Sequence, residues 1–308
     1  MSLIIDRTCR NALKRSLITI STNEVIVKIN MVSVYNELAM TPRNCLVELI
    51  EYLRNDLNFN GKVIIAEGSA VGSTFDGFRK LGLLELRKEF DIELLDIHED
   101  ETVDIPVFDS KFNEFYIPIS KTLLNSKFLI SACRAKTHDT VITTLSIKNV
   151  AVGGIVGKNN RPKIHKGYRA INVNIAILGA LMYPDHSLID GRVSMEGNGP
   201  VSGSRKEWGI VFSGRNPVEV DSLASYCMGF DPRSIGYLYY LNKLGFGEIN
   251  VYDKSHCDLA KIKTSFKPHD KYEEQLRWKL DPEEEKIIIE KIRRIVEKYG
   301  GRSINKYQ

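Results

Sequence analysis

The sequence predicts an α/β fold: a mostly parallel sheet with helices on both faces, a small hairpin insertion and a C-terminal helical extension. Two observations lead to this fold class. Short runs rich in β-branched residues alternate with amphipathic segments of helical period, and the runs are almost continuously apolar, as strands buried on both faces are. Such alternation is typical of parallel strands joined by right-handed helical crossovers.

The first half of the chain shows the alternation most clearly. A strand is predicted at residues 24–32, and the pair Thr41-Pro42 predicts the capped start of a helix that continues to about residue 57. The run KVIIAEG is a buried strand, residues 73–81 form a second helix, and IELLDI is a third strand. The residues before 24 match no clear pattern.

A hairpin insertion interrupts the alternation at residues 104–119, where two β-rich runs flank a polar turn. Beyond it the sequence predicts further strands and helices, in the order KFLISA, a helix at 167–182, SLIDG, WGIVFSG, and helices at 216–229 and 231–245. The last helix starts at Asp281-Pro282, and its early acids and late bases suit the helix dipole.

The 308-residue chain is 43% apolar and 27% charged, which is typical of a soluble globular protein. We expect an α/β domain over residues 20–250, either as one unit or as two intimate subdomains with a boundary near 135–165. An extension over residues 251–308 ends in an amphipathic helix. No apolar run is long enough to span a bilayer and no secretory pattern opens the chain, so we expect a cytoplasmic protein without a membrane partner.

The cysteines are scattered and contain no C-x-x-C pair; they are Cys9, Cys45, Cys133, Cys227 and Cys257. The sequence therefore encodes no local disulfide framework, no iron–sulfur motif and no cysteine-bound zinc motif, and reduced thiols are expected. The sequence leaves open which metal or cofactor the protein uses, if any, and how many chains assemble.

Basic charge is concentrated in one segment. The net charge of +4 is small, which argues against a dedicated nucleic-acid binder. Between Cys133 and Tyr183 the only acid is Asp139, while the basic residues are Arg134, Lys136, Lys148, Lys158, Arg161, Lys163, Lys166 and Arg169. We therefore expect this segment to be electropositive and to attract an anionic small molecule.

Ligands of open α/β sheets bind beyond the carboxyl ends of the strands, where loops and helix N-termini converge. The predicted strands end in polar residues and glycines, at Asn30, at Glu67 with Ser69, at Cys133 with Lys136 just beyond, at Asp190-Gly191 and at Ser213-Gly214. Each position taken alone has another interpretation, because Asp, Gly and Ser also end strands in ordinary turns.

The stretch CRAKTHDTVITTLSIKNVAVGG places His138 and Lys148 at the two ends of a short apolar element. A histidine can carry a proton, ligate a metal or bind an anion, and nearby lysines lower its pKa and attract negative charge. His138 and Lys148 are therefore candidate catalytic residues, with Lys136 and Asn149 as ligand contacts. A solvated basic loop with a surface histidine is the alternative.

The glycine-rich basic loop VGGIVGKNNRPKIHKGYR runs into the helix at 167–182. Backbone N–H groups and cationic side chains in such a loop can surround a phosphate or carboxylate, which makes His165 and Lys166 ligand-binding candidates. The loop lacks the spaced glycine-lysine pattern of a nucleoside-triphosphate site. A mobile surface loop is one alternative, and contact with a nucleic-acid backbone is another.

The segment IDGRVSMEGNGPVSG is expected to form a rigid exposed turn that brings Glu196 and Asn198 close to a ligand. Asp190, Glu196 and Asp221 are the acids considered for acid/base work or for a hard cation, and Asp190 is the catalytic candidate among them. An isolated carboxylate is more often a helix cap or a salt-bridge partner.

In order along the chain, VKINMV, TPRNCLVELIEYL, VIIAEGS, CRAKTHDTVITTLSIKNVAVGG, IDGRVSMEGNGPVSG and SGRNPVEVDSLASYCMG resemble domain-of-unknown-function family 362, over roughly residues 20–250. The resemblance implies a bacterial or archaeal protein of an α/β family without an agreed activity, whose members often carry a ferredoxin-like iron–sulfur module. No cysteine-rich module follows residue 250 here, and Ile29 stands where a proline is usual. An electron-transfer role would therefore need a separate ferredoxin-like partner.

A fainter similarity is to lactate racemases that use a nickel-pincer nucleotide. The interval from His138 to Lys148, followed by a pair of glycines, is similar to the interval in those enzymes between a histidine and the lysine that holds the cofactor. The similarity implies that Lys148 would contact such a cofactor, and that His138 would move a proton at a carbon next to a carboxylate.

Three hypotheses follow, in order of preference. The first is an enzyme or cofactor-binding protein with a basic cleft for a small molecule that bears a phosphate or a carboxylate. The second is a non-catalytic partner of an iron–sulfur redox protein. The third is a nucleic-acid backbone binder that uses the basic residues around 158–169.

Overall fold

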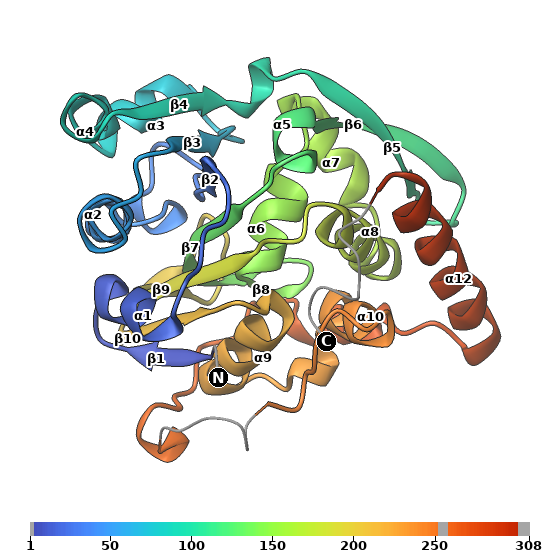
Figure 1. The fold of residues 1–308 in the computed structure, drawn as a ribbon. Coiled ribbons are helices and arrows are strands. Elements are labelled where there is room, and N and C mark those ends of the chain that lie inside the picture. The colour runs from blue at the N-terminus through green and yellow to red at the C-terminus, as the bar shows by residue number, and fades with distance from the viewer. Residues whose placement is uncertain (1–2, 252–257, 301–308) are drawn as a thin grey trace.

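The computed structural model describes residues 3–251 and 258–300, and its centre is a single large sheet (Figure 1). The order of its strands is β1-β10-β9-β7-β2-β3-β4, with β8 paired to β7. The strands are β1 (Ile4–Asp6), β2 (Glu24–Lys28), β3 (Lys62–Glu67), β4 (Ile92–Asp96), β7 (Leu129–His138), β8 (Ile142–Thr144), β9 (His186–Glu196) and β10 (Ser204–Gly214).

The sheet is mostly parallel, as predicted. The neighbours β9, β7, β2, β3 and β4 all run in the same direction. Strands β8 and β10 run in the opposite direction, and β1 pairs antiparallel with β10. Since consecutive parallel strands need helical crossovers, the predicted alternation of strands and helices produces this half of the sheet directly.

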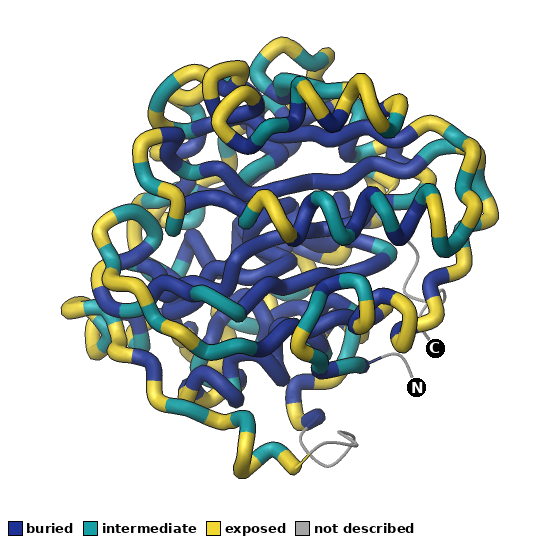
Figure 2. The backbone as a smooth tube through the Cα atoms, turned by 90° about the vertical axis from the view of Figure 1, so that its left-hand side faces the viewer, coloured by how far each residue is buried: buried dark blue, intermediate teal, exposed yellow. Residues whose placement is uncertain are grey.

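Helices cover both faces of the sheet, which confirms the predicted fold class. One face packs against α1 (Cys9–Ser16), α2 (Arg43–Glu51), α3 (Thr74–Lys80) and α4 (Leu83–Phe90). The other packs against α6 (Ser146–Gly153), α8 (Tyr168–Leu181), α9 (Pro217–Met228) and α10 (Gly236–Lys243). Alternate residues of β2 serve the two faces, and Figure 2 shows the central strands buried between exposed outer turns.

The predicted hairpin and the terminal helix are both present. Strands β5 (Thr102–Phe108) and β6 (Glu114–Ser120) form a separate two-stranded sheet, and the short helix α5 (Lys121–Leu124) follows them. Helix α12 (Pro282–Lys298) is capped by Asp281 and buries Ile288 and Ile292, and Figure 1 shows it at the outer edge of the molecule beside α8 and the hairpin.

Short elements complete the described chain. They are α7 (Arg161–Ile164), α11 (Tyr272–Gln275), a π-helical turn at Tyr52–Asp56, and 3-10 turns at Glu37–Ala39, Ile97–Glu99, Lys158–Asn160, Pro232–Ser234, Leu259–Lys261 and Leu276–Trp278. Helix α7 and the turn before it lie in the predicted glycine-rich loop. That segment is therefore partly helical and ordered against α6.

Two predictions about strand ends are wrong. Strand β9 does not end at Asp190 but continues to Glu196, so Asp190 lies inside the strand with 0% exposure. Strand β10 runs antiparallel to β9, which places Ser213 at the opposite edge of the sheet from the carboxyl ends of the parallel strands. Thr41 also differs from the prediction: its hydroxyl donates to the Ala132 carbonyl instead of capping α2.

Candidate functional site

A cavity of about 410 Å³ lies at the carboxyl ends of β2, β3 and β7, where the general rule for open α/β sheets places a ligand. Its polar walls come from the ends of these strands, from α6 and from α7. The apolar part of the lining consists of Met31, Val32, Ala70, Val71, Val152, Pro162 and Pro200. A cavity of this size and mixed character is typical of a small-molecule site.

The floor of the cavity is a buried ion pair between neighbouring strands. Lys28 ends β2 and Glu67 ends β3, and their charged atoms are 2.9 Å apart with both side chains almost fully buried. Lys28 also donates to the Ile29 carbonyl at 2.6 Å, while Glu67 accepts from the Gly68 N–H at 2.8 Å. Burial lowers the pKa of Lys28, although Glu67 opposes the shift.

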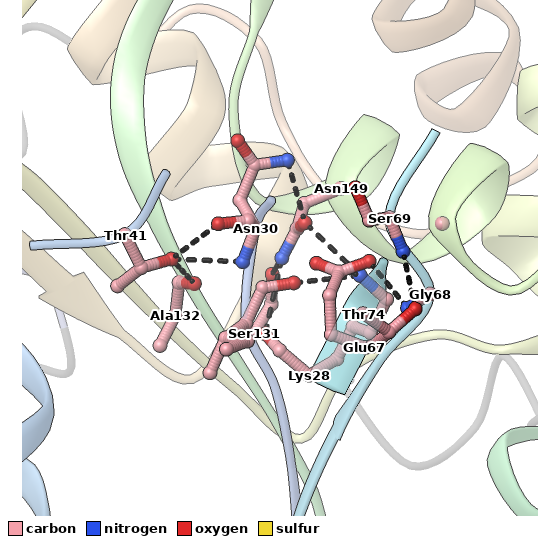
Figure 3. A network of polar contacts seen from close by, with 12 residues as sticks. Lys28, Asn30, Thr41, Glu67, Gly68, Ser69, Thr74, Ser131, Ala132 and Asn149 are labelled. Atoms are coloured by element: carbon pink, nitrogen blue, oxygen red, sulfur yellow. Dashed lines mark hydrogen bonds and ion pairs between the residues drawn. The ribbon is translucent and has the colours of Figure 1, made fainter. Parts of the chain in front are cut away.

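Asn149 of α6 connects this ion pair to the other strands (Figure 3). Its amide nitrogen donates to the Lys28 carbonyl and to the Ser131 hydroxyl, each at 3.1 Å, and its amide oxygen accepts from Asn30 at 3.2 Å. The oxygen of Asn30 accepts in turn from the ammonium of Lys136. The buried polar groups under the cavity thus form one continuous hydrogen-bonded network.

The wall of the cavity contrasts with its floor, because several buried polar atoms there lack partners. Lys148 is only 6% exposed, and no residue within 3–251 or 258–300 forms a hydrogen bond or an ion pair with its ammonium. The Arg161 Nε and the Thr144 hydroxyl are likewise buried without a hydrogen bond to the described part of the chain. Unpaired buried donors cost free energy, so they indicate a partner that the protein itself does not supply.

His138 presents one ring nitrogen to the cavity side. Its Nδ1 is already surrounded, with a carboxylate oxygen of Asp139 at 2.9 Å and the N–H and hydroxyl of Thr140 at 3.1 and 3.0 Å. Nε2 is therefore the nitrogen left for a ligand. His165 lies beside it, with ring centres 6.1 Å apart, and uses its own Nδ1 to donate to the Arg161 carbonyl.

Burial and mutual repulsion keep several basic groups of the site partly or fully neutral. Burial, with the nearby Lys148 ammonium, lowers the pKa of His138 to about 3 and that of His165 to about 4. Burial lowers the pKa of Lys148 to about 8 and that of Lys136 to about 7. At neutral pH both histidines are neutral, so Lys148 and Arg161 supply the cationic character of this wall.

Asp221 holds the helix that carries Lys148 and Asn149. Its carboxylate accepts from the N–H groups of Ser146 and Ile147, both at 2.9 Å, at the first turn of α6. Burial raises the pKa of Asp221 to about 8, and the two backbone donors oppose that shift. The acid considered from the sequence for proton transfer or a hard cation is thus the N-terminal cap of the site's helix.

The structure brings together half of the residues predicted for the site. The predicted residues that line the cavity are Asn30, Glu67, His138, Lys148, Asn149 and His165. Lys136 lies one hydrogen bond behind the wall, through Asn30. Ser69 is nearby but donates to the Val71 carbonyl within its own loop.

Besides Lys136 and Ser69, four more predicted site residues do not line the cavity. Lys166 is exposed at the surface beyond α7. Asp190 faces α1 and α2 and pairs with Arg192 at 2.7 Å. Glu196 accepts from the Lys267 N–H at 3.0 Å, and Asn198 and Asp270 exchange two hydrogen bonds, so both residues hold the C-terminal extension.

Four residues that line the cavity were not expected there from the sequence: Lys28, Asp139, Thr144 and Arg161. Lys28 could have been noticed as the one charged residue within the buried run VIVKINMV, since a lysine between buried strand neighbours needs a partner. Thr144 carried no comparable signal. Its importance comes from β8, which pairs with the end of β7 and turns the hydroxyl toward α6.

These features define an α/β protein with a cation-rich cavity at the carboxyl edge of a parallel sheet. The chain belongs to the family described as Domain of unknown function (DUF362), whose model matches residues 25–226. This match covers the strands and helices that build the cavity. It confirms the family suggested by the sequence motifs.

Two known proteins show more distant likeness. A thylakoid-associated protein of Synechocystis sp. is 23% identical over 188 residues, which is 60% of this chain and 57% of the relative, so the chain spans little more than half of that protein. The structure of a lactate racemase apoprotein from Thermoanaerobacterium thermosaccharolyticum aligns with a TM-score of 0.44 and 13% identity, over 73% of this chain and 56% of that one. Within the described residues, no helix has both the length and the apolar character needed to cross a membrane.

Proposed function

We propose that the cavity binds an anionic small molecule, and that its anionic group pairs with Lys148 and Arg161. The ammonium of Lys148 carries this proposal, because it lines the cavity on a side chain that is only 6% exposed and makes no hydrogen bond to the described residues, so a bound anion would supply the acceptor that it lacks. The Arg161 Nε, also buried and without a hydrogen bond to the described residues, supports the same conclusion.

The balance of charge favours a dianion. The cavity is lined by Lys28, Lys148, Lys158 and Arg161, against the carboxylates of Glu67 and Asp139. The lining therefore carries an excess of two positive charges. A phosphate monoester or a dicarboxylate balances this excess, whereas a single carboxylate leaves part of it. The apolar lining then accommodates the uncharged body of the same molecule.

His138 would transfer a proton to or from the bound molecule through Nε2. Burial first, and the Lys148 ammonium second, lower the pKa of His138, which makes it a weak base. A bound anion beside Lys148 offsets the second of these causes, so ligand binding raises the pKa of His138 and favours proton exchange through Nε2. An enzyme that charges its base only in the complex would avoid an uncompensated buried imidazolium.

The binding proposal is tested by a thermal-shift screen of phosphate monoesters and dicarboxylates, followed by calorimetric titration of the best anion. Loss of a charge-assisted hydrogen bond costs about 1.5–3 kcal/mol, so Lys148→Met should weaken binding roughly tenfold to hundredfold. Lys62→Met is the matched control, because Lys62 starts β3 at the opposite end from Glu67 and pairs with Glu93. Equal affinity in wild type and Lys148→Met would overturn the proposal.

The proton-transfer proposal has a separate test. The pKa of His138 should rise when the anion binds, as followed by the imidazole proton resonances during a pH titration. His186 is the internal control, since burial also lowers its pKa to about 3 but it hydrogen bonds to Ser213 away from the cavity. A shift of both histidines, or of neither, would contradict the assignment. Binding should also weaken above about pH 8, as Lys148 loses its proton.

A further inference from the structure

A second group of ligating side chains lies on the face of the sheet covered by α1 and α2. Cys9 is the first residue of α1, Cys45 lies in the first turn of α2, and Asp190 lies in β9. One ligating atom of each lies within 4.8 Å of those of the other two, and all three residues have 0% exposure. The cavity uses none of them.

We propose that Cys9, Cys45 and Asp190 form a binding site for a thiophilic divalent metal ion such as Zn²⁺. Two thiolates and a carboxylate are donors that zinc accepts, and a tetrahedral ion with ordinary bond lengths separates sulfur from oxygen donors by about 3.5 Å. The Cys9 sulfur and the nearer Asp190 oxygen are 3.7 Å apart, so this pair already has the separation that a shared ion requires. A water molecule would supply the fourth donor.

Arg192 provides the outer hydrogen bonds of such a site. Its Nη2 donates to Asp190 at 2.7 Å and to the Cys9 sulfur at 3.4 Å, while its Nη1 reaches Glu48 at 2.5 Å. Hydrogen bonds of this kind orient metal ligands and reduce the charge on a thiolate. The same guanidinium contacts two of the proposed donors at once, which a merely space-filling cysteine would not need.

The charge of the cluster also permits a buried ion. Binding exchanges two thiol protons for one divalent cation: M²⁺ bonds to the two sulfur atoms, and the two protons pass to solvent. The formal charge of the group formed by the two cysteines, Asp190, Glu48 and Arg192 is therefore the same before and after. No extra charge is transferred into the protein interior, where it would be costly.

An entry path and a comparison among cysteines support the assignment. The side chains of Arg192 and Glu48 are 19% and 20% exposed, so these two polar side chains connect the buried cluster to the protein surface. Cys133 and Cys227 are just as buried but lie in the apolar cluster of the opposite face. Among the described residues, neither belongs to a group of three potential metal ligands. Cys257 lies outside the described residues.

The test is titration of chelator-treated protein with Co²⁺ and Zn²⁺ in the presence of a phosphine reductant. We expect one equivalent of Co²⁺ to give the near-ultraviolet absorption of a cobalt–thiolate bond, and Zn²⁺ to displace it and raise the melting temperature. Cys9→Ala and Cys45→Ala should each weaken binding more than the tenfold to hundredfold typical of losing an outer hydrogen bond, which is the effect expected for Arg192→Met.

Cys133→Ala is the matched control and should bind the metal like wild type. Far-ultraviolet circular dichroism of each variant confirms folding; if Cys9→Ala does not fold, the decision rests on Cys45→Ala and on native mass spectrometry of the wild type. Absence of a stoichiometric complex in wild type would overturn the proposal. So would a complex whose affinity and spectrum do not change when Cys45 is replaced.

Discussion

Two buried lysines face the same cavity, and their surroundings differ. Lys28 on the floor has an ion-pair partner, a backbone carbonyl and the oxygen of Asn149 within hydrogen-bonding distance. Lys148 on the wall has no hydrogen-bonding partner in residues 3–251 and 258–300. The comparison separates a residue that maintains the fold from one whose position is explained by a ligand, because Lys28 has a contact ion pair and hydrogen bonds within the protein, whereas Lys148 has only the more distant charge of Asp139.

Removing the Lys28–Glu67 ion pair on the cavity floor should have the largest effect on the free energy of unfolding. Glu67→Gln leaves the charge of Lys28 buried without its counter-ion, and loss of one partner from a buried pair costs about 3–5 kcal/mol. Urea denaturation measures the change. The control is Glu93→Gln, whose ion pair with Lys62 is exposed and should contribute about 0–1 kcal/mol. Similar losses of unfolding free energy in the two variants would contradict a larger contribution from the buried Lys28–Glu67 pair.

Removing the Asp221 cap of α6 should have the next largest effect on stability, and it should also change the affinity of the cavity for the anion. Above about pH 8, where Asp221 is ionised, Asp221→Asn replaces one of the two acceptors for the Ser146 and Ile147 N–H groups with an amide NH2 that cannot accept, at a cost of about 2 kcal/mol. Since α6 carries both Lys148 and Asn149, anion affinity should fall together with stability. Asp281→Ala, at the exposed cap of α12, should lower stability by about 1 kcal/mol without changing anion affinity.

A third lysine, Lys136, should make the stability of the protein depend on pH. The pKa of Lys136 is lowered by burial to about 7 in the folded protein, against about 10.4 in an unfolded chain. Between these values the unfolded state holds a proton that the folded state has released, so stability rises with pH, by up to about 1.4 kcal/mol per pH unit. Lys136→Met should remove this slope between pH 7.5 and 9.5. Parallel stability profiles for the variant and wild type would contradict a lowered pKa.

The sequence was informative about the cavity floor because strand ends are readable. Runs of β-branched residues located β2, β3 and β7, and parallel strands gather their carboxyl ends at one edge. Asn30, Glu67 and His138 could therefore be grouped before any contact was known. The same reasoning cannot identify the Lys28–Glu67 pair, because nothing in one strand's sequence shows which neighbour it will have.

The sequence was misleading at β9, and the reason is steric. Gly191 after Asp190 looked like a strand end, but a side chain at this position would collide with the ring of Trp208 on the neighbouring strand β10. The glycine thus allows close packing within a strand instead of ending it. The strand therefore continues past Asp190 to Glu196. Glu196 and Asn198 then lie beside the C-terminal extension and hydrogen bond to Lys267 and Asp270.

The donors of the proposed metal site could not be recognised from the sequence, because they lie far apart along the chain. The cysteine-bound zinc motifs that can be read from a sequence have ligands a few residues apart, whereas Cys9, Cys45 and Asp190 come from two helices and a strand separated along the chain. Only the packing of α1 and α2 against β9 brings them together. Spacing rules address local motifs alone, so they do not bear on the proposed site, whose donors are brought together by tertiary structure.

The most direct measurement is the unfolding free energy of Lys148→Met with and without the anion selected by screening. Without the anion, replacing a buried charge that has no hydrogen bond or contact ion pair by an apolar side chain should stabilise the protein by about 1 kcal/mol, whereas Lys28→Met should destabilise it. With saturating anion the order should reverse, because wild type gains binding free energy that the variant lacks. A Lys148→Met protein that is less stable than wild type without the anion, or that gains as much from it, would contradict the conclusion that Lys148 is held in place for a ligand.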